Sequence, residues 1–202
     1  MKTLTIELDV RDRSALVVGG RGEAVSKIHR LIHAGAVVTV IAPPGPIDAS
    51  VEEAAREGRV ELHRRAAEER DAEGRAIVFL EPGDDELSRR LFDRARMSGG
   101  LVCTLDRPEV STFINPAVVQ VSGLTLSVST GGKSPALARR IREDLEALFG
   151  DARFARFLSA LGDLRAALPR GDRGSRIKEA VEGFAIEARV RFPGWFERGE
   201  RP

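Results

Sequence analysis

The sequence is poor in the features that would place it outside the cytoplasm. Its 202 residues include one cysteine, Cys103, so no disulfide can form within the chain. No apolar run is long enough to cross a membrane, and residues 1–7 alternate like a short strand instead of forming the core of a signal peptide. We therefore expect a cytoplasmic protein with no membrane partner.

The sequence also lacks an excess of charge of one sign. Its 32 basic and 31 acidic residues give a formal net charge of +1. Such a balance provides no bulk attraction for nucleic acid or for an anionic membrane. Partners must therefore be inferred from local sites, and we expect no nucleic acid among them.

Apolar runs alternate with helical patterns through the first half of the chain. The expected strands are 15–18, 37–41, 60–63, 76–80 and 101–105. Helices are expected to begin at residues 23, 49 and 84. This alternation predicts an α/β fold with a Rossmann-type parallel sheet, whose ligands lie beyond the carboxyl ends of the strands.

The pattern changes near Pro116. Two apolar strands, 117–121 and 124–129, are joined by a hairpin signal and followed by a helix over 135–149. One further helical stripe covers 154–168, and a last helical pattern covers 177–186. A hairpin and one helix bury too little apolar surface alone, so we expect a homodimer.

These patterns divide the chain into three expected domains. They are a Rossmann dinucleotide-binding domain over 1–115, a small α+β dimerisation unit over 116–150, and a C-terminal helical tail over 151–202.

A glycine-rich turn, Gly19-Gly20-Arg21-Gly22, follows the first core strand and precedes the first helix. Read as G-x-G-x-x-[GA], it has Gly19 and Ala24 in the outer places and Arg21 in the middle one. Arg21 either crowds the phosphates of a dinucleotide or binds them. No acid follows Ile41 to hold a ribose hydroxyl, so a purely structural β-α-β unit stays open beside nucleotide binding.

Asp106 comes directly after the strand at 101–105, at the edge where ligands of such a sheet bind. A carboxylate there could accept a proton from a substrate or bind a metal. An aspartate before Arg107-Pro108 is also an ordinary turn residue, and its position alone does not separate these readings.

A second helix N-terminus lies at Gly131-Gly132-Lys133-Ser134. It is not a Walker A loop, because Ser127 stands where the leading glycine would be needed. Lys133, Arg139 and Arg140 form either a clamp for a carboxylate-rich ligand or a solvated surface.

Two other features have ordinary structural explanations. His29 and His33 share a helix face, but no third ligand is near them in the sequence, so we expect surface histidines and no metal site. Cys103 lies inside a predicted strand, where a buried apolar role is favoured over a reactive one.

Three segments together resemble a known family: VVGGRGEAVSKIHRLIHAGAVVTVIAP, LDRPEVSTFINPAVV and LSVSTGGKSPALARRIRE. In order and spacing they resemble the siroheme-synthase N-terminal family, precorrin-2 dehydrogenase/sirohydrochlorin ferrochelatase. The resemblance covers residues 3 to 150, and more loosely the helical tail. It implies the stand-alone form of this module, since no tetrapyrrole methyltransferase domain follows.

The resemblance implies a homodimer that oxidises precorrin-2, a tetrapyrrole, to sirohydrochlorin with NAD. Some members also insert ferrous iron, which makes iron a candidate second substrate here. The family's catalytic aspartate corresponds to Asp106. The expected cofactor-binding residues are Gly19, Gly20, Arg21, Gly22, Glu23, Ala24, Pro43, Glu81 and Pro82. The expected substrate-binding residues are Asn115, Thr130, Gly131, Gly132, Lys133, Ser134 and Arg139.

Three positions depart from the family pattern. Arg21 replaces a glycine of the cofactor loop, Glu81-Pro82-Gly83 replaces a small-residue stretch beside the cofactor, and Cys103 replaces an asparagine. The first two border the dinucleotide. A member that keeps a chelating or tetrapyrrole-binding role without NAD is therefore one alternative, and a non-catalytic nucleotide-sensing module is another.

Overall fold

The computed structural model describes residues 3–81 and 83–201. The chain forms two compact units that meet in sequence between Pro116 and Ala117. We call the first the sheet unit and the second the hairpin unit, and we describe each by itself. The assignment of separate dinucleotide-binding, dimerisation and tail domains stays a prediction.

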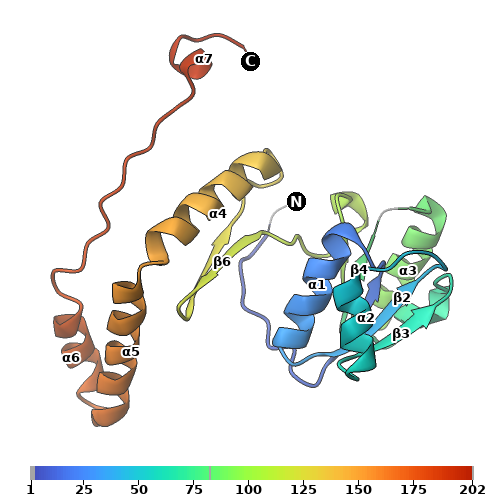
Figure 1. The fold of residues 1–202 in the computed structure, drawn as a ribbon, viewed down its shortest axis with the longest axis horizontal. Helices are drawn as coiled ribbons and strands as arrows, with labels where there is room; N and C mark the ends of the chain where they lie inside the picture. The colour runs from blue at the N-terminus through green and yellow to red at the C-terminus, as the bar shows by residue number, and fades with distance from the viewer. Residues whose placement is uncertain (1–2, 82, 202) are drawn as a thin grey trace. The chain divides into compact units, whose positions relative to one another are not determined.

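The sheet unit is built on five parallel strands (Figure 1). They are β1 Ser14–Val18, β2 Val37–Ala42, β3 Val60–Arg64, β4 Ile77–Leu80 and β5 Leu101–Thr104. The strand order is β3-β2-β1-β4-β5, so the order of connection reverses between β1 and β4. This arrangement confirms the predicted Rossmann-type fold, and ligands of such sheets bind at the reversal point.

Helices cover both faces of this sheet. The helices α1 Gly22–His33 and α2 Ala49–Arg56 bury their apolar sides on one face, with a core that includes Val17, Ile28 and Val40. The helix α3 Asp85–Met97 and the 3-10 helix η1 Glu69–Ala72 cover the other face. The central strands are continuous apolar runs because both of their faces are buried.

The hairpin unit begins with two antiparallel strands, β6 Ala117–Val121 and β7 Leu124–Val128. Ser122 and Gly123 join them, both with positive φ, as in the two-residue turns whose twist suits a hairpin. The helix α4 Pro135–Phe149 follows, with Ser134 as its N-cap and Pro135 in its first turn. The predicted hairpin and helix are therefore confirmed.

The remaining helices are α5 Ala152–Ala167, α6 Arg173–Ala180 and the short α7 Gly194–Glu197. The prediction of a helix over 177–186 was wrong at both ends. Gly183 has a φ of +84°, which ends the helical path, and Phe184 turns back to stack on Phe157 of α5 at 5.6 Å between ring centroids. Packing between aromatic rings thus overrides the helical spacing of the sequence.

The alternating residues near the N-terminus do not form a strand in their described part, residues 3–7. Leu4 and Ile6 are exposed there. A strand needs a hydrogen-bonded neighbour, and the sheet pairs only β1 to β5. Alternation alone was therefore an insufficient signal.

Candidate functional site

Three expected site residues meet the carboxyl edge of the sheet directly. The amide of Gly19 donates to the carbonyl of Ile41 at 2.9 Å, and the amide of Glu81 donates to the carbonyl of Val18 at 2.9 Å. These bonds continue the ladders of β1 one residue past its end. Leu105 is held to Leu80 in the same way, also at 2.9 Å, so the next residue, Asp106, begins its turn at this edge.

The glycine turn has the geometry that a dinucleotide-binding loop requires. Gly19 has a φ of +129° and is buried, a conformation that L side chains rarely adopt. A Cβ placed on Gly19 would lie 2.9 Å from the Cβ of Glu81 and 3.2 Å from the Cβ of Ala24. Only glycine therefore fits here, and the packing that requires it comes from both β4 and α1.

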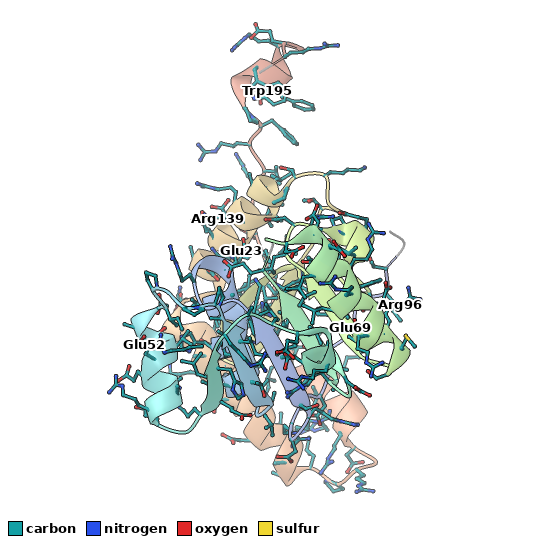
Figure 2. The ribbon with its side chains drawn as sticks, turned by 90° about the vertical axis from the view of Figure 1, so that its right-hand side faces the viewer. Glu23, Glu52, Glu69, Arg96, Arg139 and Trp195 are labelled. Carbon is teal, nitrogen blue, oxygen red and sulfur yellow. The ribbon has the colours of Figure 1, made fainter. Side chains whose placement is uncertain are left out.

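Arg21 precedes α1 with an extended backbone, and its side chain is exposed. Glu23 follows in the first turn of α1 (Figure 2), where its carboxylate lies 3.8 Å from the ammonium of Lys27. Lys27 is itself buried, a feature that the sequence pattern did not reveal. The start of α1 thus carries charges of both signs, in addition to the positive end of its dipole.

Glu81 is the residue that follows β4, and it is partly buried. Burial raises the pKa of its carboxyl above the usual range, and the positive charge of Arg21 partly offsets that rise. The two departures from the family's cofactor loop therefore act on each other. Pro82, also expected to bind the cofactor, lies outside the described residues, whereas Pro43 is exposed just past β2.

Asp106 is exposed and has a φ of +59°, a left-handed conformation that aspartate tolerates better than most residues. The amide of Arg107 donates to the carbonyl of Thr104 at 3.1 Å and closes the turn around Asp106. The guanidinium of Arg107 pairs with Asp85 and Glu109. The turn is therefore tied to the start of α3.

Buried hydroxyl groups fix the rest of this loop. The amide of Thr104 donates to Ser111 Oγ at 2.9 Å, and Thr104 Oγ1 donates to the carbonyl of Val110 at 2.7 Å. Ser111 Oγ in turn donates to the carbonyl of Arg107 at 2.8 Å. The sequence reasoning missed this network, although hydroxyl residues on both sides of Asp106 were a signal for it.

Asn115, an expected substrate contact, already has a partner in the sheet unit. Its Oδ1 accepts a hydrogen bond from Arg30 Nη1 at 3.4 Å, which joins the segment after β5 to α1. Nearby Cys103 is buried, and burial raises the pKa of its thiol to about 11. The expectation of a buried, unreactive cysteine is thus confirmed.

The two histidines of α1 do not act together. His29 Nε2 lies 2.8 Å from Ser50 Oγ of α2, whereas His33 is exposed. Within residues 3–81 and 83–201, no cluster of three histidine, cysteine or acidic side chains could hold a metal ion. His29 instead connects two helices.

In the hairpin unit, the turn before α4 is held by Thr130. Its Oγ1 accepts from the amide of Ser134 at 3.0 Å, and the glycines between them, Gly131 and Gly132, have positive φ. Lys133 is exposed, and Arg139 (Figure 2) pairs with Glu143 one helical turn later at 2.9 Å. The positive charge of Arg139 therefore has a partner within α4. A substrate-binding role for these residues stays a prediction.

The strand order, with its reversal between β1 and β4, and the glycine turn are those of a dinucleotide-binding α/β protein of the Rossmann type. The chain belongs to the family described as putative NAD(P)-binding, which matches residues 6–117. Residues 122–148 match the family described as sirohaem biosynthesis protein central. Together these matches confirm the resemblance to the siroheme-synthase N-terminal family.

Two of the similar proteins are named siroheme synthase. The siroheme synthase of Methylococcus capsulatus is 34% identical over 202 residues, and siroheme synthase 1 of Halorhodospira halophila is 37% identical over 179 residues. The chain spans 39% and 37% of the length of these relatives. A solved structure of SirC, precorrin-2 dehydrogenase, superposes with a TM-score of 0.75 at 24% identity, covering 90% of each chain. This structure shares the fold.

Throughout the part of the chain that the structure describes, every helix is too short or too polar to cross a bilayer.

Proposed function

We propose that this protein oxidises precorrin-2 to sirohydrochlorin with NAD as the hydride acceptor. The observation that carries the proposal is the carboxyl edge of the sheet, where the turn at Gly19 follows β1 and the turn at Asp106 follows β5, with β4 between these two strands. The family match over residues 6–117 and the names of the siroheme synthase relatives support the same activity.

The residues of the glycine turn fit a dinucleotide. Gly19 and Gly20 let the chain turn closely against neighbouring side chains, and α1 begins at Gly22 with its N-terminal end next to the turn. The amides and dipole of a helix start favour a pyrophosphate. NAD bound there supplies a two-electron acceptor for the hydride of the substrate. Arg21 adds a guanidinium at the same place.

Asp106 is the proposed base. Loss of hydride from precorrin-2 must be accompanied by loss of a proton, and a positioned carboxylate oxygen can accept it. Asp106 is exposed, and buried hydrogen bonds of Thr104 and Ser111 support its loop. Such support reduces the cost of placing the carboxylate at the reacting atom.

Substrate binding and metal insertion are parts of the same proposal. Precorrin-2 is a polycarboxylate, so we assign its recognition to the amides and cations of the turn from Thr130 to Ser134, together with Asn115 and Arg139. Ferrous iron is the proposed second substrate, inserted into sirohydrochlorin after oxidation. We also propose a homodimer and a cytoplasmic location.

Two alternatives would change this assignment. A chelatase without NAD is favoured by one observation, the side chain of Glu81 beside Gly19. A nucleotide-sensing module would bind NAD without turnover.

One assay tests the three readings. Purified protein is given freshly generated precorrin-2 and NAD without oxygen, the absorbance of NADH and sirohydrochlorin is followed, and ferrous or cobaltous ion is then added. Oxidation followed by metallation is the expected result. Metallation of supplied sirohydrochlorin without oxidation would indicate the chelatase, and neither reaction in a protein that binds NAD would indicate the sensor.

A further inference from the structure

The carboxylate of Glu81 lies against the glycine turn. A Cβ placed on Gly19 would overlap Glu81 Oε2, and one placed on Gly22 would lie 3.9 Å from Glu81 Oε1. The two oxygens of one side chain thus reach toward both ends of the turn. In this fold the pyrophosphate of a dinucleotide lies at the turn between the first strand and the first helix, which is the turn that this carboxylate lies against.

The charges around this carboxylate come from several elements that end at the same edge. They are Arg21 in the turn, Glu23 and Lys27 on α1, Asp84 and Asp85 at the start of α3, and Asp106 and Arg107 after β5. Most have their own partners: Glu23 lies near Lys27, Asp84 accepts from the amides of Glu86 and Leu87, and Asp85 pairs with Arg107. Arg21 is the cation that acts on Glu81.

The surroundings of Glu81 suit an anion only in part. A helix N-terminus and a nearby guanidinium attract negative charge. Burial nevertheless raises the pKa of the carboxyl, so its charged form is held less favourably than in water. A second anion brought to the same turn would meet Coulomb repulsion from this carboxylate.

We propose that Glu81 competes with the pyrophosphate of NAD for the glycine turn. Its carboxylate lies at this turn and must move away or take up a proton before NAD binds. This inference rests on the proposed function and adds a gate to it. The gate is the carboxylate of Glu81, which obstructs the cofactor site until it moves or is protonated. Arg21 then has two roles, attracting the carboxylate in the free protein and the phosphates in the bound one. The position of Glu81 thereby sets the affinity for the cofactor and its dependence on pH.

The test is calorimetric titration of the folded full chain with NAD. Wild type is compared with E81Q, which keeps the shape and removes the charge, and with E81A, which empties the place. E57Q is the matched control, since it removes one carboxylate from the end of α2. We expect E81Q and E81A to bind NAD roughly tenfold more tightly than wild type at neutral pH, and E57Q to bind as wild type does.

A pH series supplies a second readout. Because bound phosphates raise the pKa of Glu81 further, binding takes up a proton, and wild-type affinity is expected to rise as the pH falls from about 8 to about 5. E81Q should show a flat profile over the same range. NAD is used because the 2′-phosphate of NADP titrates near pH 6 itself.

The outcomes separate this inference from the proposed function. Tighter NAD binding by both variants supports the gate. NAD binding by E81Q and E81A but not by wild type also supports the gate, and would show that wild type is not an NAD enzyme. Equal affinities in wild type and E81Q would overturn the gate and leave the NAD enzyme intact. Weaker binding by E81Q would overturn it too, since Glu81 would then be a direct ligand. No binding by any variant at millimolar NAD would overturn both.

Discussion

At the scale of single residues, Asp106 combines an exposed carboxylate with a fixed backbone. Its φ of +59° places it in the left-handed region, which asparagine accepts as readily as aspartate. The substitution D106N therefore removes the charge without straining the turn. The residue can be tested for chemistry separately from folding.

The first prediction concerns this substitution. D106N should keep the fold and NAD affinity and lose about 10²-fold or more in the rate of precorrin-2 oxidation, the scale of general-base removal. Stopped-flow measurement of NADH formation checks the rate. D12N is the matched control, because Asp12 has a φ of +58° in a turn before β1. A D106N protein as fast as D12N would remove Asp106 from the mechanism.

The second prediction concerns Glu81 and pH. Its folded-state pKa is raised by burial, so the folded protein binds more protons than the unfolded chain between the two pKa values. The charged carboxylate therefore destabilises the fold. This destabilisation is absent below the ordinary glutamate range near pH 4 and is complete above the raised pKa. E81Q should melt at a higher temperature than wild type near neutral pH, and this advantage should shrink on acidification.

Thermal unfolding of ligand-free protein from about pH 4 to about pH 8 checks this dependence. E57Q again serves as the control for loss of one negative charge. A melting-temperature difference that is constant with pH, or that grows in acid, would show that burial does not act on Glu81 in this way.

The sequence predicted the residues at this edge better than their interactions. Gly19, Glu81 and Asp106 could be placed because parallel strands end at one edge. The approach of Glu81 to Gly19 could not, because it depends on how β4 lies beside β1. The burial of Lys27 was hidden for a similar reason, since a charged residue on a helix is usually solvated.

At the scale of elements, the loop from Thr104 to Ser111 is a small structure of its own. Its hydrogen bonds are buried, so each lost partner leaves a polar group without water. The sequence predicted the strand before this loop and the turn at its start. The network itself depended on which hydroxyl groups pointed inward, and no pattern of period two or 3.6 reports that.

The third prediction tests this loop. T104V keeps the volume of the side chain and leaves the carbonyl of Val110 without its donor, so it should cost about 1–3 kcal/mol of unfolding free energy. It should also lower the oxidation rate, because Asp106 is held less firmly. Urea unfolding measures the first effect and steady-state kinetics the second. T5V, at an exposed position, should change neither, and a T104V protein as stable as T5V would contradict the proposed support.

The C-terminal elements show where local pattern failed. The helix expected over 177–186 is replaced by α6 Arg173–Ala180 and an irregular segment. Phe184 leaves the helix to join Phe154 and Phe157, a contact that sequence spacing does not encode. Helix signals at 135–149 succeeded because Ser134 and Pro135 specify that start locally.

At the scale of the whole molecule, the hairpin unit exposes an apolar helix face. Leu137, Ile141 and Leu148 of α4 are 51%, 37% and 42% exposed. These residues lie on the apolar side of α4, yet within one chain they remain exposed. A second copy of the chain packed on this face would explain why these apolar side chains are exposed in one chain, since homodimer interfaces are more apolar than the remaining surface.

The fourth prediction follows from this face. Wild type should sediment as a dimer at micromolar concentration, with twice the 22.0 kDa mass of one chain, whereas I141E should shift toward the monomer because it introduces a charge into the apolar face. L164E, on α5, is the comparison at another exposed leucine. Wild type that sediments as a single chain would contradict the proposal.

We propose that this chain oxidises precorrin-2 with NAD, and the stoichiometry of the two products tests this proposal. Wild type is incubated without oxygen with NAD in excess over precorrin-2, and NADH and sirohydrochlorin are quantified in the same samples over time. We expect both to appear together in equal amounts, and D106N to slow both to the same extent. Sirohydrochlorin forming without NADH, or no oxidation by a protein that binds NAD and is shown to be folded, would contradict it.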